Sequence, residues 1–189
     1  MSDTLPRSPD GKRLLHIGCG SIDSPYFVNI DARRLPHVHF LINEILEIRF
    51  IPDASFDFVY MSHVLEHVPH QQTVDVLCQI QRILRPGGVC RLSVPDFDHL
   101  VSIYQHNDND LERIIHPLMG GQDYRYNYHY GIFNHKLLSE QFAKAGFVNI
   151  RAWSPHDCAH HDFSDTSSLH INIKGKEFPV SLNLEADKP

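Results

Sequence analysis

The chain has 189 residues, of which 42% are hydrophobic and 21% are charged. These values are ordinary for a soluble globular protein and exclude an intrinsically disordered chain. The length is close to that of one hydrophobic core, so we expect a single domain over residues 1–189. A net charge of −6 argues against a nucleic-acid partner, because proteins that bind phosphate backbones concentrate lysine and arginine. A small-molecule partner is the better expectation.

The first 12 residues are polar and include Pro6 and Pro9, which predicts a flexible N-terminus. They lack the basic-then-apolar order of a secretion signal, and no later apolar run is long enough to cross a membrane. We therefore expect a cytoplasmic protein without a membrane partner. The four cysteines are scattered with no Cys-x-x-Cys pair, which predicts reduced structural thiols. The oligomeric state is left open.

The first half of the chain alternates apolar runs with turns. Four strands are predicted, over residues 14–17, 26–30, 38–42 and 56–61. Apolar residues at helical spacing then predict a helix over 73–84, ended by Pro86 and the glycines that follow it. A fifth strand is predicted over 89–94. A strand-helix-strand unit of this kind pairs in parallel, which predicts an α/β fold.

The second half is predicted to add helices and two closing strands. Helices are expected over 97–104, 111–118 and 135–144, and strands over 147–153 and 180–186. The stretch 154–168 is polar and is expected to be a solvated surface loop. It includes His156, His160 and His161, whose metal-binding potential we consider the weaker interpretation.

The first predicted strand ends in Gly18-Cys19-Gly20, where glycine lets a ligand approach the backbone. A dinucleotide site requires a third glycine and a helix that holds the pyrophosphate. Asp23 stands at the third position here, and too few residues precede the next strand for a crossover helix. The turn favours a nucleoside without phosphate, such as S-adenosylmethionine, with Asp31 accepting from its ribose. A purely structural turn is the alternative.

The sequence resembles class I methyltransferases, specifically a predicted bacterial group whose first motif is similar to Leu-His-Leu-Gly-Cys-Gly. The matching segments are Leu14 to Gly20, Val28 to Asp31, Phe56 to Val59, Leu84 to Gly88, Leu92 to Asp96, Ala145 to Phe147 and Ser181 to Ala186. The resemblance implies a Rossmann-like, mostly parallel sheet flanked by helices, with an antiparallel C-terminal edge strand. It also implies an enzyme that transfers a methyl group from S-adenosylmethionine.

By this resemblance, several segments contact the methyl donor. The implied donor-binding residues are Gly18, Cys19, Gly20, Asp31, Glu44, Ile45, Ser62 and His63. The turn holds the amino-acid part, Asp31 the ribose, and Glu44 with Ile45 the adenine edge, with Asn43 as the alternative to Glu44. The chain departs from larger relatives at His16, where they carry an acidic residue, and in its short connection after the turn. Both departures are expected to weaken donor binding.

The segment 62–67 follows the fourth strand, at the sheet edge where open α/β proteins bind ligands. If it starts a helix, His63, Glu66 and His67 share one face and form a plausible metal-ligand set. Ubiquinone and small-RNA O-methyltransferases are similar in placing Glu-x-x-Glu-His here, and His129 matches the later histidine of the RNA group. That similarity implies a divalent metal on His63, Glu66, His67 and His129. Histidine for the first glutamate favours zinc, manganese or iron over magnesium.

This segment has two interpretations besides a metal site in a methyltransferase. In the first, Glu66 and His67 only stabilise a helix while His63 contacts the donor. In the second, the three residues form the metal site of a metal-dependent hydrolase. The predicted strand before the segment argues against the hydrolase, because inverted zinc peptidases bury this motif in a long helix.

Four tyrosines alternate with polar residues over 124–130. They predict either a segment that closes over the site, with rings stacking on a flat acceptor, or a strand with one aromatic face in the core. The predicted reaction is methyl transfer to a hydroxyl of a small molecule or glycan precursor. His63 or His129, or a metal-bound hydroxide, would remove the proton. A noncatalytic protein that binds S-adenosylmethionine is the alternative.

Overall fold

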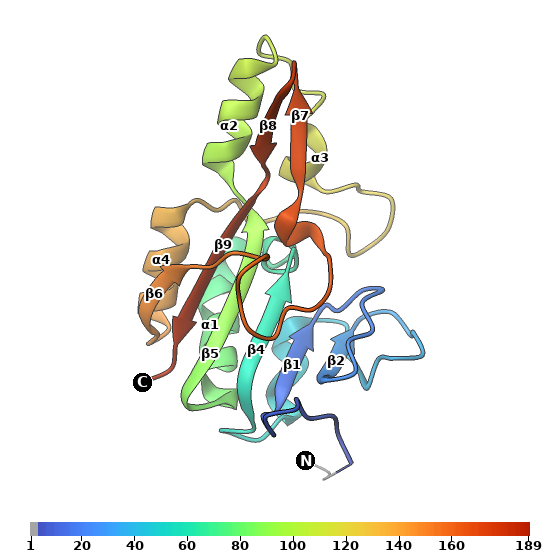
Figure 1. The fold of residues 1–189 in the computed structure, drawn as a ribbon, viewed down its shortest axis with the longest axis vertical. Coiled ribbons are helices and arrows are strands. Elements are labelled where there is room, and N and C mark those ends of the chain that lie inside the picture. The colour runs from blue at the N-terminus through green and yellow to red at the C-terminus, as the bar shows by residue number, and fades with distance from the viewer. Residues whose placement is uncertain (1–3) are drawn as a thin grey trace.

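The computed structural model describes residues 4–189, and within them seven strands form one sheet (Figure 1). The strands are β1 (Leu14–Ile17), β2 (Phe27–Asp31), β3 (Phe40–Leu41), β4 (Phe56–Ser62), β5 (Leu84–Pro95), β6 (Val148–Ala152) and β9 (Ser181–Asp187). Their order is β3-β2-β1-β4-β5-β9-β6, and only β9 runs antiparallel to its neighbours. The predicted Rossmann-like α/β fold with a mostly parallel sheet is confirmed.

The antiparallel strand does not lie at the edge, so that part of the prediction is wrong. Strand β9 is inserted between β5 and β6, and β6 forms the edge. Most residues of β9 are buried, whereas four of the five residues of β6 are exposed. The polar residues Asn149 and Arg151 suit β6 to an edge that faces water.

The helices α1 (Thr73–Ile83) and α4 (His135–Lys144), with the short turn η1 (Ile45–Phe50), pack together against one face of this sheet. The other longer helix is α2 (Phe97–His106), and the other short ones are α3 (Ile115–Met119), η2 (Leu65–His67), η3 (His70–Gln72) and η4 (Thr166–Ser168). Figure 1 shows α1 and α4 behind the strands. The buried side of α1 presents Val76, Leu77 and Ile80 to the core. Helix α4 begins where the Asn134 side chain accepts from the Leu137 N–H.

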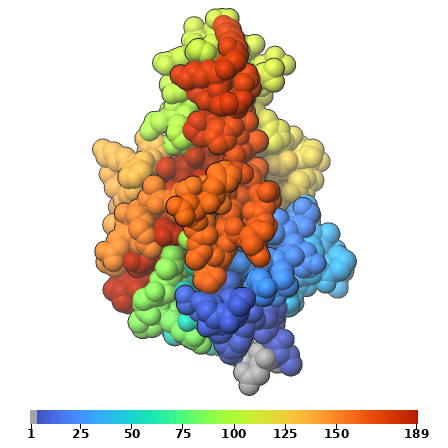
Figure 2. Space-filling view, in the orientation of Figure 1, coloured from blue at the N-terminus to red at the C-terminus, as the bar shows by residue number. Residues whose placement is uncertain are grey.

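The two faces of the sheet are covered differently. Alternation along β1 directs Leu15 and Ile17 to the helical side, and Leu14 and His16 to the other side. That other side has no long helix over it; it is covered by residues 154–168, which lie across the middle of the molecule in Figure 2. This stretch is a surface loop, as predicted, but it is not fully solvated, because Phe163 and His161 pack against the aromatic residues of the sheet.

Above the carboxyl ends of the strands, the chain forms a small extension of α2, α3 and a hairpin (Figure 1). The hairpin strands are β7 (His170–Ile173) and β8 (Lys176–Pro179). Its turn residues Lys174 and Gly175 both have positive φ, as a two-residue hairpin turn requires. The helix predicted over 111–118 is reduced to α3, because Pro117 lacks an N–H and fits only the first turn of a helix.

Residues 1–3 of the predicted flexible N-terminus lie outside the described residues. The following part contains a hydrogen-bonded turn in which Ser8 Oγ accepts from the Lys12 N–H at 3.0 Å. Across residues 4–189, no helix has the length and apolar character needed to cross a bilayer.

Candidate active site

A cleft of about 480 Å³ opens at the carboxyl ends of β1, β2 and β4. Its walls come from four parts of the chain: the turn after β1 with the end of β2, residues 42–46, residues 63–76, and residues 124–130. Parallel α/β sheets bind ligands at this edge because loops from neighbouring strands diverge there. The cleft therefore joins the predicted donor turn and the His-x-x-Glu-His segment in one space.

The donor turn depends on Gly18, which has φ +68. A Cβ atom at this position would lie 2.3 Å from Val64 Cγ2, so any side chain would displace Val64. Asp31 stabilises the turn from the end of β2, because its Oδ2 accepts from the Gly20 N–H at 2.8 Å. Its Oδ1 accepts from the backbone and side chain of Arg33 at 2.8 and 3.2 Å. A ribose hydroxyl at Asp31 would share a carboxylate that already orders the turn.

The predicted donor residues divide into two groups. Gly18, Asp31, Glu44, Ile45 and His63 line the cleft, as does Asn43 beside Glu44. Cys19, Gly20 and Ser62 do not line it. Burial raises the pKa of the Cys19 thiol to about 12, so this group stays protonated and unreactive.

The His-x-x-Glu-His segment does not start an α-helix, so the helical face considered for its three residues does not form. His63 has φ +52, residues Leu65–His67 form the short turn η2, and α1 begins only at Thr73. Pro69 is the physical reason, because a proline disfavours helical backbone at the residue before it, and Val68 is extended. The turn still gathers the predicted metal ligands.

Glu66, His67 and His129 each offer one ligand atom that lies within 4.8 Å of the other two. His63 joins them, with its Nδ1 atom 3.4 Å from Glu66 Oε1, and His129 Nε2 lies 4.0 Å from the same oxygen. All four residues of the predicted metal site therefore lie together. His129 comes from a separate part of the chain, 62 residues beyond His67.

Glu66 is the centre of this cluster. Its side chain is only 1% exposed, and neither of its carboxylate oxygens has a hydrogen-bond partner. Burial would raise the pKa of Glu66, but the adjacent His63 and then the charges of His67 and His129 hold that pKa below its ordinary value. Burial also lowers the pKa of His129. A buried carboxylate without donors costs free energy unless a cation neutralises it.

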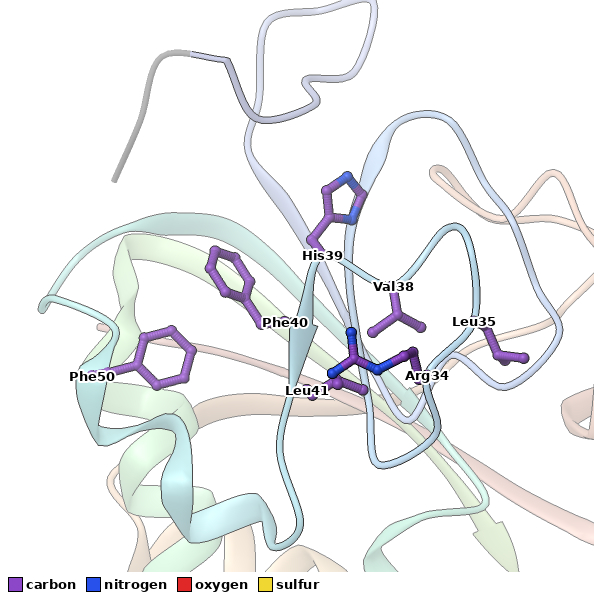
Figure 3. A pocket seen from close by; sticks show the side chains of 7 residues that line it. All are labelled: Arg34, Leu35, Val38, His39, Phe40, Leu41 and Phe50. Carbon is purple, nitrogen blue, oxygen red and sulfur yellow. The ribbon is translucent and has the colours of Figure 1, made fainter.

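The tyrosine segment does not form the strand that was one of the two alternatives for it. The Gln122 N–H donates to Asn127 C=O and the Asn127 N–H to Tyr124 C=O, so the segment closes into a turn. Tyr124, Tyr128 and Tyr130 are 45, 38 and 57% exposed and line the cleft, which excludes an aromatic face in the core. A second hollow, of about 500 Å³, lies beside β3, and Figure 3 shows the side chains that line it. Most of them are apolar, such as Phe40 and Phe50, and the ionisable ones are Arg34 and His39.

Two cleft features are not predicted from the sequence. Arg33 lines the cleft through its contact with Asp31, and Ser181 Oγ lies 2.8 Å from His63 Nε2. Arg33 follows Asp31 closely and could be suspected from that position. Ser181 lies 118 residues from His63, and only the register of β9 against β5 brings the two together.

Comparisons with known proteins agree with this fold and cleft. A family model described as a methyltransferase domain matches residues 1–152. A SAM-dependent methyltransferase from Archaeoglobus fulgidus superposes with a TM-score of 0.60 at 15% identity, covering 94% of this chain and 86% of the other. A 1,6-didemethyltoxoflavin-N1-methyltransferase from Burkholderia thailandensis, solved with its substrate and S-adenosylhomocysteine, has a TM-score of 0.57 at 18% identity, covering 94 and 71%. A search of curated proteins found no match.

The fold and cleft are those of a class I methyltransferase, an enzyme class that uses S-adenosylmethionine. The chain belongs to the methyltransferase-domain family, since that family's model matches most of its length. It is an S-adenosylmethionine-dependent methyltransferase, and the metal-dependent hydrolase considered from the sequence is excluded.

Proposed function

We propose that the enzyme methylates a hydroxyl group of a small molecule or glycan precursor, with a divalent metal beside the methyl donor. One observation carries the proposal. His63 and His67 line the same cleft as Gly18 and Asp31, and Glu66 and His129 adjoin these two histidines. A donor on the glycine turn would therefore direct its methyl group toward a site rich in proton acceptors and potential metal ligands.

The reaction balances without a further reactant. The acceptor oxygen bonds to the methyl carbon, the bond between that carbon and the donor sulfur breaks, and S-adenosylhomocysteine leaves. The hydroxyl proton passes to the cluster, where His63 and His129 are the predicted bases, or to water in the open cleft. Placement of the two reactants supplies much of the rate enhancement.

The chemistry of the cluster fits a divalent ion. Glu66 supplies an unpartnered carboxylate, and His67 and His129 supply imidazole nitrogens within reach of it. The Nδ1 atoms of these histidines lie 3.0 Å from the carbonyl oxygens of Tyr128 and Pro117. Such contacts typically orient metal-binding histidines. A bound divalent ion would lower the pKa of an acceptor hydroxyl beside it.

The acceptor side of the cleft is formed by the exposed tyrosines and Arg125. The Arg125 guanidinium lies 5.2 Å from the centre of the Tyr126 ring, and no acidic partner of Arg125 is found within residues 4–189. Exposed rings stack on the flat faces of sugars or aromatic acceptors. These side chains support a flat or polyhydroxyl acceptor.

Calorimetry with S-adenosylhomocysteine tests the donor site. We expect Asp31→Asn to weaken binding about tenfold, the effect of one lost hydrogen bond to a charged group. Asp23→Ala, in the exposed part of the same turn, should bind normally and is the matched control. Wild-type protein that fails to bind S-adenosylhomocysteine, or equal affinity of Asp31→Asn and wild type, contradicts the proposed donor site.

Turnover is tested with methyl-labelled S-adenosylmethionine and a panel of nucleotide sugars, free sugars and phenols. We expect label in a methyl ether and an equal amount of S-adenosylhomocysteine. Donor binding without turnover on any member of the panel contradicts the proposed hydroxyl acceptor.

Metal content is measured on protein purified without a histidine tag. We expect about one bound divalent ion per chain, lost on His67→Ala and with chelator. Full activity of metal-free enzyme in chelator rules out the metal.

A further inference from the structure

His63 is held by a hydrogen-bond chain that the proposed reaction does not use. Ser181 Oγ lies 2.8 Å from the Thr166 carbonyl oxygen and 2.8 Å from His63 Nε2. A carbonyl oxygen only accepts hydrogen bonds, so the single hydroxyl proton of Ser181 is donated to Thr166. Ser181 must then accept from His63, which places the proton of a neutral His63 on Nε2.

This tautomer leaves a lone pair on Nδ1, the nitrogen that faces Glu66 Oε1 at 3.4 Å. The same reasoning applies to the other two rings. Nδ1 of His67 lies 3.0 Å from the Tyr128 carbonyl, and Nδ1 of His129 lies 3.0 Å from the Pro117 carbonyl, so both must carry a proton. In each neutral ring, the nitrogen that contacts Ser181 or a backbone carbonyl is therefore protonated, and the other nitrogen keeps a lone pair.

Three imidazole lone pairs thus accompany one buried carboxylate, and no donor satisfies its oxygens. With neutral rings this arrangement is repulsive, and either a proton taken up by an imidazole or a bound metal cation relieves it. The backbone of His63 is also in the left-handed region, at φ +52, which is uncommon for a residue other than glycine. Its N–H donates to the Ser93 carbonyl at 2.8 Å, which fixes this conformation.

We propose that Ser181 is a positioning residue, which orients the His63 ring so that Nδ1 is the nitrogen offered to the metal. The inference rests on the metal site of the proposed function and assigns His63 to holding the ion, so the acceptor proton leaves to water. Three nitrogens and one carboxylate favour zinc, manganese, iron or cobalt over magnesium or calcium. Ser181 begins β9 and Thr166 begins η4, so two segments far along the chain position this ligand.

Cobalt(II) is the probe, because its visible absorption reports the ligands around it. We expect Ser181→Ala to weaken cobalt binding about 10- to 100-fold, the usual effect of removing a residue that orients a metal ligand, and to change the spectrum. Ser181→Thr keeps the hydroxyl and should restore both properties. Ser139→Ala removes a serine hydroxyl in α4 that has no hydrogen-bond partner, and should change neither. S-adenosylhomocysteine binding, measured in parallel, should be equal in all four proteins and shows that they are folded.

A second measurement needs no Ser181 variant. In the zinc-loaded wild-type protein, nitrogen NMR should show His63 with a proton on Nε2 and a metal-shifted Nδ1, with His63→Gln providing the assignment. An unshifted Nδ1, or a cobalt affinity and spectrum that Ser181→Ala leaves unchanged, overturns the inference. If the wild type binds no metal, the metal part of the proposed function fails too, whereas normal donor binding would preserve the rest.

Discussion

Two buried carboxylates, Glu66 and Asp165, lie in regions that are both rich in histidine, and their surroundings are opposite. Asp165 accepts from Tyr60 Oη at 2.5 Å and from the N–H and hydroxyl of Ser167 at 2.9 and 2.5 Å. These hydrogen bonds overcome the effect of burial and lower the pKa of Asp165. Glu66 is surrounded by imidazoles and has no hydrogen-bond donor.

The difference separates a structural carboxylate from a functional one. Hydrogen-bond donors already satisfy the Asp165 carboxylate, and through these bonds Asp165 holds residues 154–168 against the sheet. Glu66 has only histidines beside its carboxylate, which fits a place in a cation-binding site. Histidine content alone, which both regions share, does not make the distinction.

The largest expected effect comes from Glu66→Gln. Loss of the only carboxylate should weaken metal binding by a factor of about 100 or more, as removal of a ligand does, while the metal-free protein unfolds at the same or a higher temperature. Removing an unpaired buried charge is neutral or stabilising. Metal titration measures the loss of affinity, and thermal unfolding in chelator measures the stability of the metal-free protein. Clear destabilisation of the metal-free variant would show that Glu66 is structural.

Asp165→Ala should give the converse result. We expect a loss of about 2–4 kcal/mol in the free energy of unfolding, because Tyr60 and Ser167 would keep buried donors without an acceptor. Metal affinity should change much less than in Glu66→Gln. Urea denaturation gives the first value and metal titration the second. A folded variant with an unchanged free energy of unfolding would show that Asp165 has no structural role.

The buried His16 makes the stability of the protein depend on pH. Burial lowers its pKa to about 4, against 6.5 for an unperturbed histidine, so between these values the unfolded chain takes up a proton that the folded chain does not. Stability should therefore fall as the pH drops from about 6.5 to 4, by about 2–3 kcal/mol from this residue. Denaturation at several pH values should show a smaller fall for His16→Leu. His161, whose pKa burial also lowers, keeps some of the dependence in that variant.

The smallest expected effect is that of Tyr60→Phe. It removes one of the hydrogen bonds to Asp165 and should cost about 1 kcal/mol. Asp165 keeps the two donors of Ser167, so the segment stays in place. Denaturant unfolding against wild type gives the value, and a loss as large as that of Asp165→Ala would mean that Tyr60 alone anchors the segment.

The sequence predicts what depends on local patterns. Apolar runs indicate the strands from β1 to β5, helical spacing predicts α1 within one residue of its end, and the glycine turn with Asp31 indicates the cleft. The histidine cluster follows from four residues that matched the motifs of other methyltransferases. All four lie together, although the backbone between them is a turn and not the helix that was assumed.

Features that depend on distant contacts are not visible in the sequence. Residues 154–168 are polar enough to predict a solvated loop, yet a few side chains, above all Phe163, pack against the sheet and hold the loop on it. The position of β9 inside the sheet and the contact of Ser181 with His63 depend on strand register over more than 100 residues. The hairpin of β7 and β8 is an exception, because Lys174-Gly175 between two short runs is a local signal that predicts a hairpin turn.

The tyrosine segment is attached to the His-x-x-Glu-His turn mainly through its main chain. The N–H groups of Tyr130 and Gly131 both donate to the Glu66 carbonyl, and the Tyr128 carbonyl faces the His67 ring. An attachment through peptide groups leaves the rings of Tyr124, Tyr126 and Tyr128 open to substitution. The enzyme's choice of acceptor can therefore diversify, in evolution or by design, with the catalytic centre left intact.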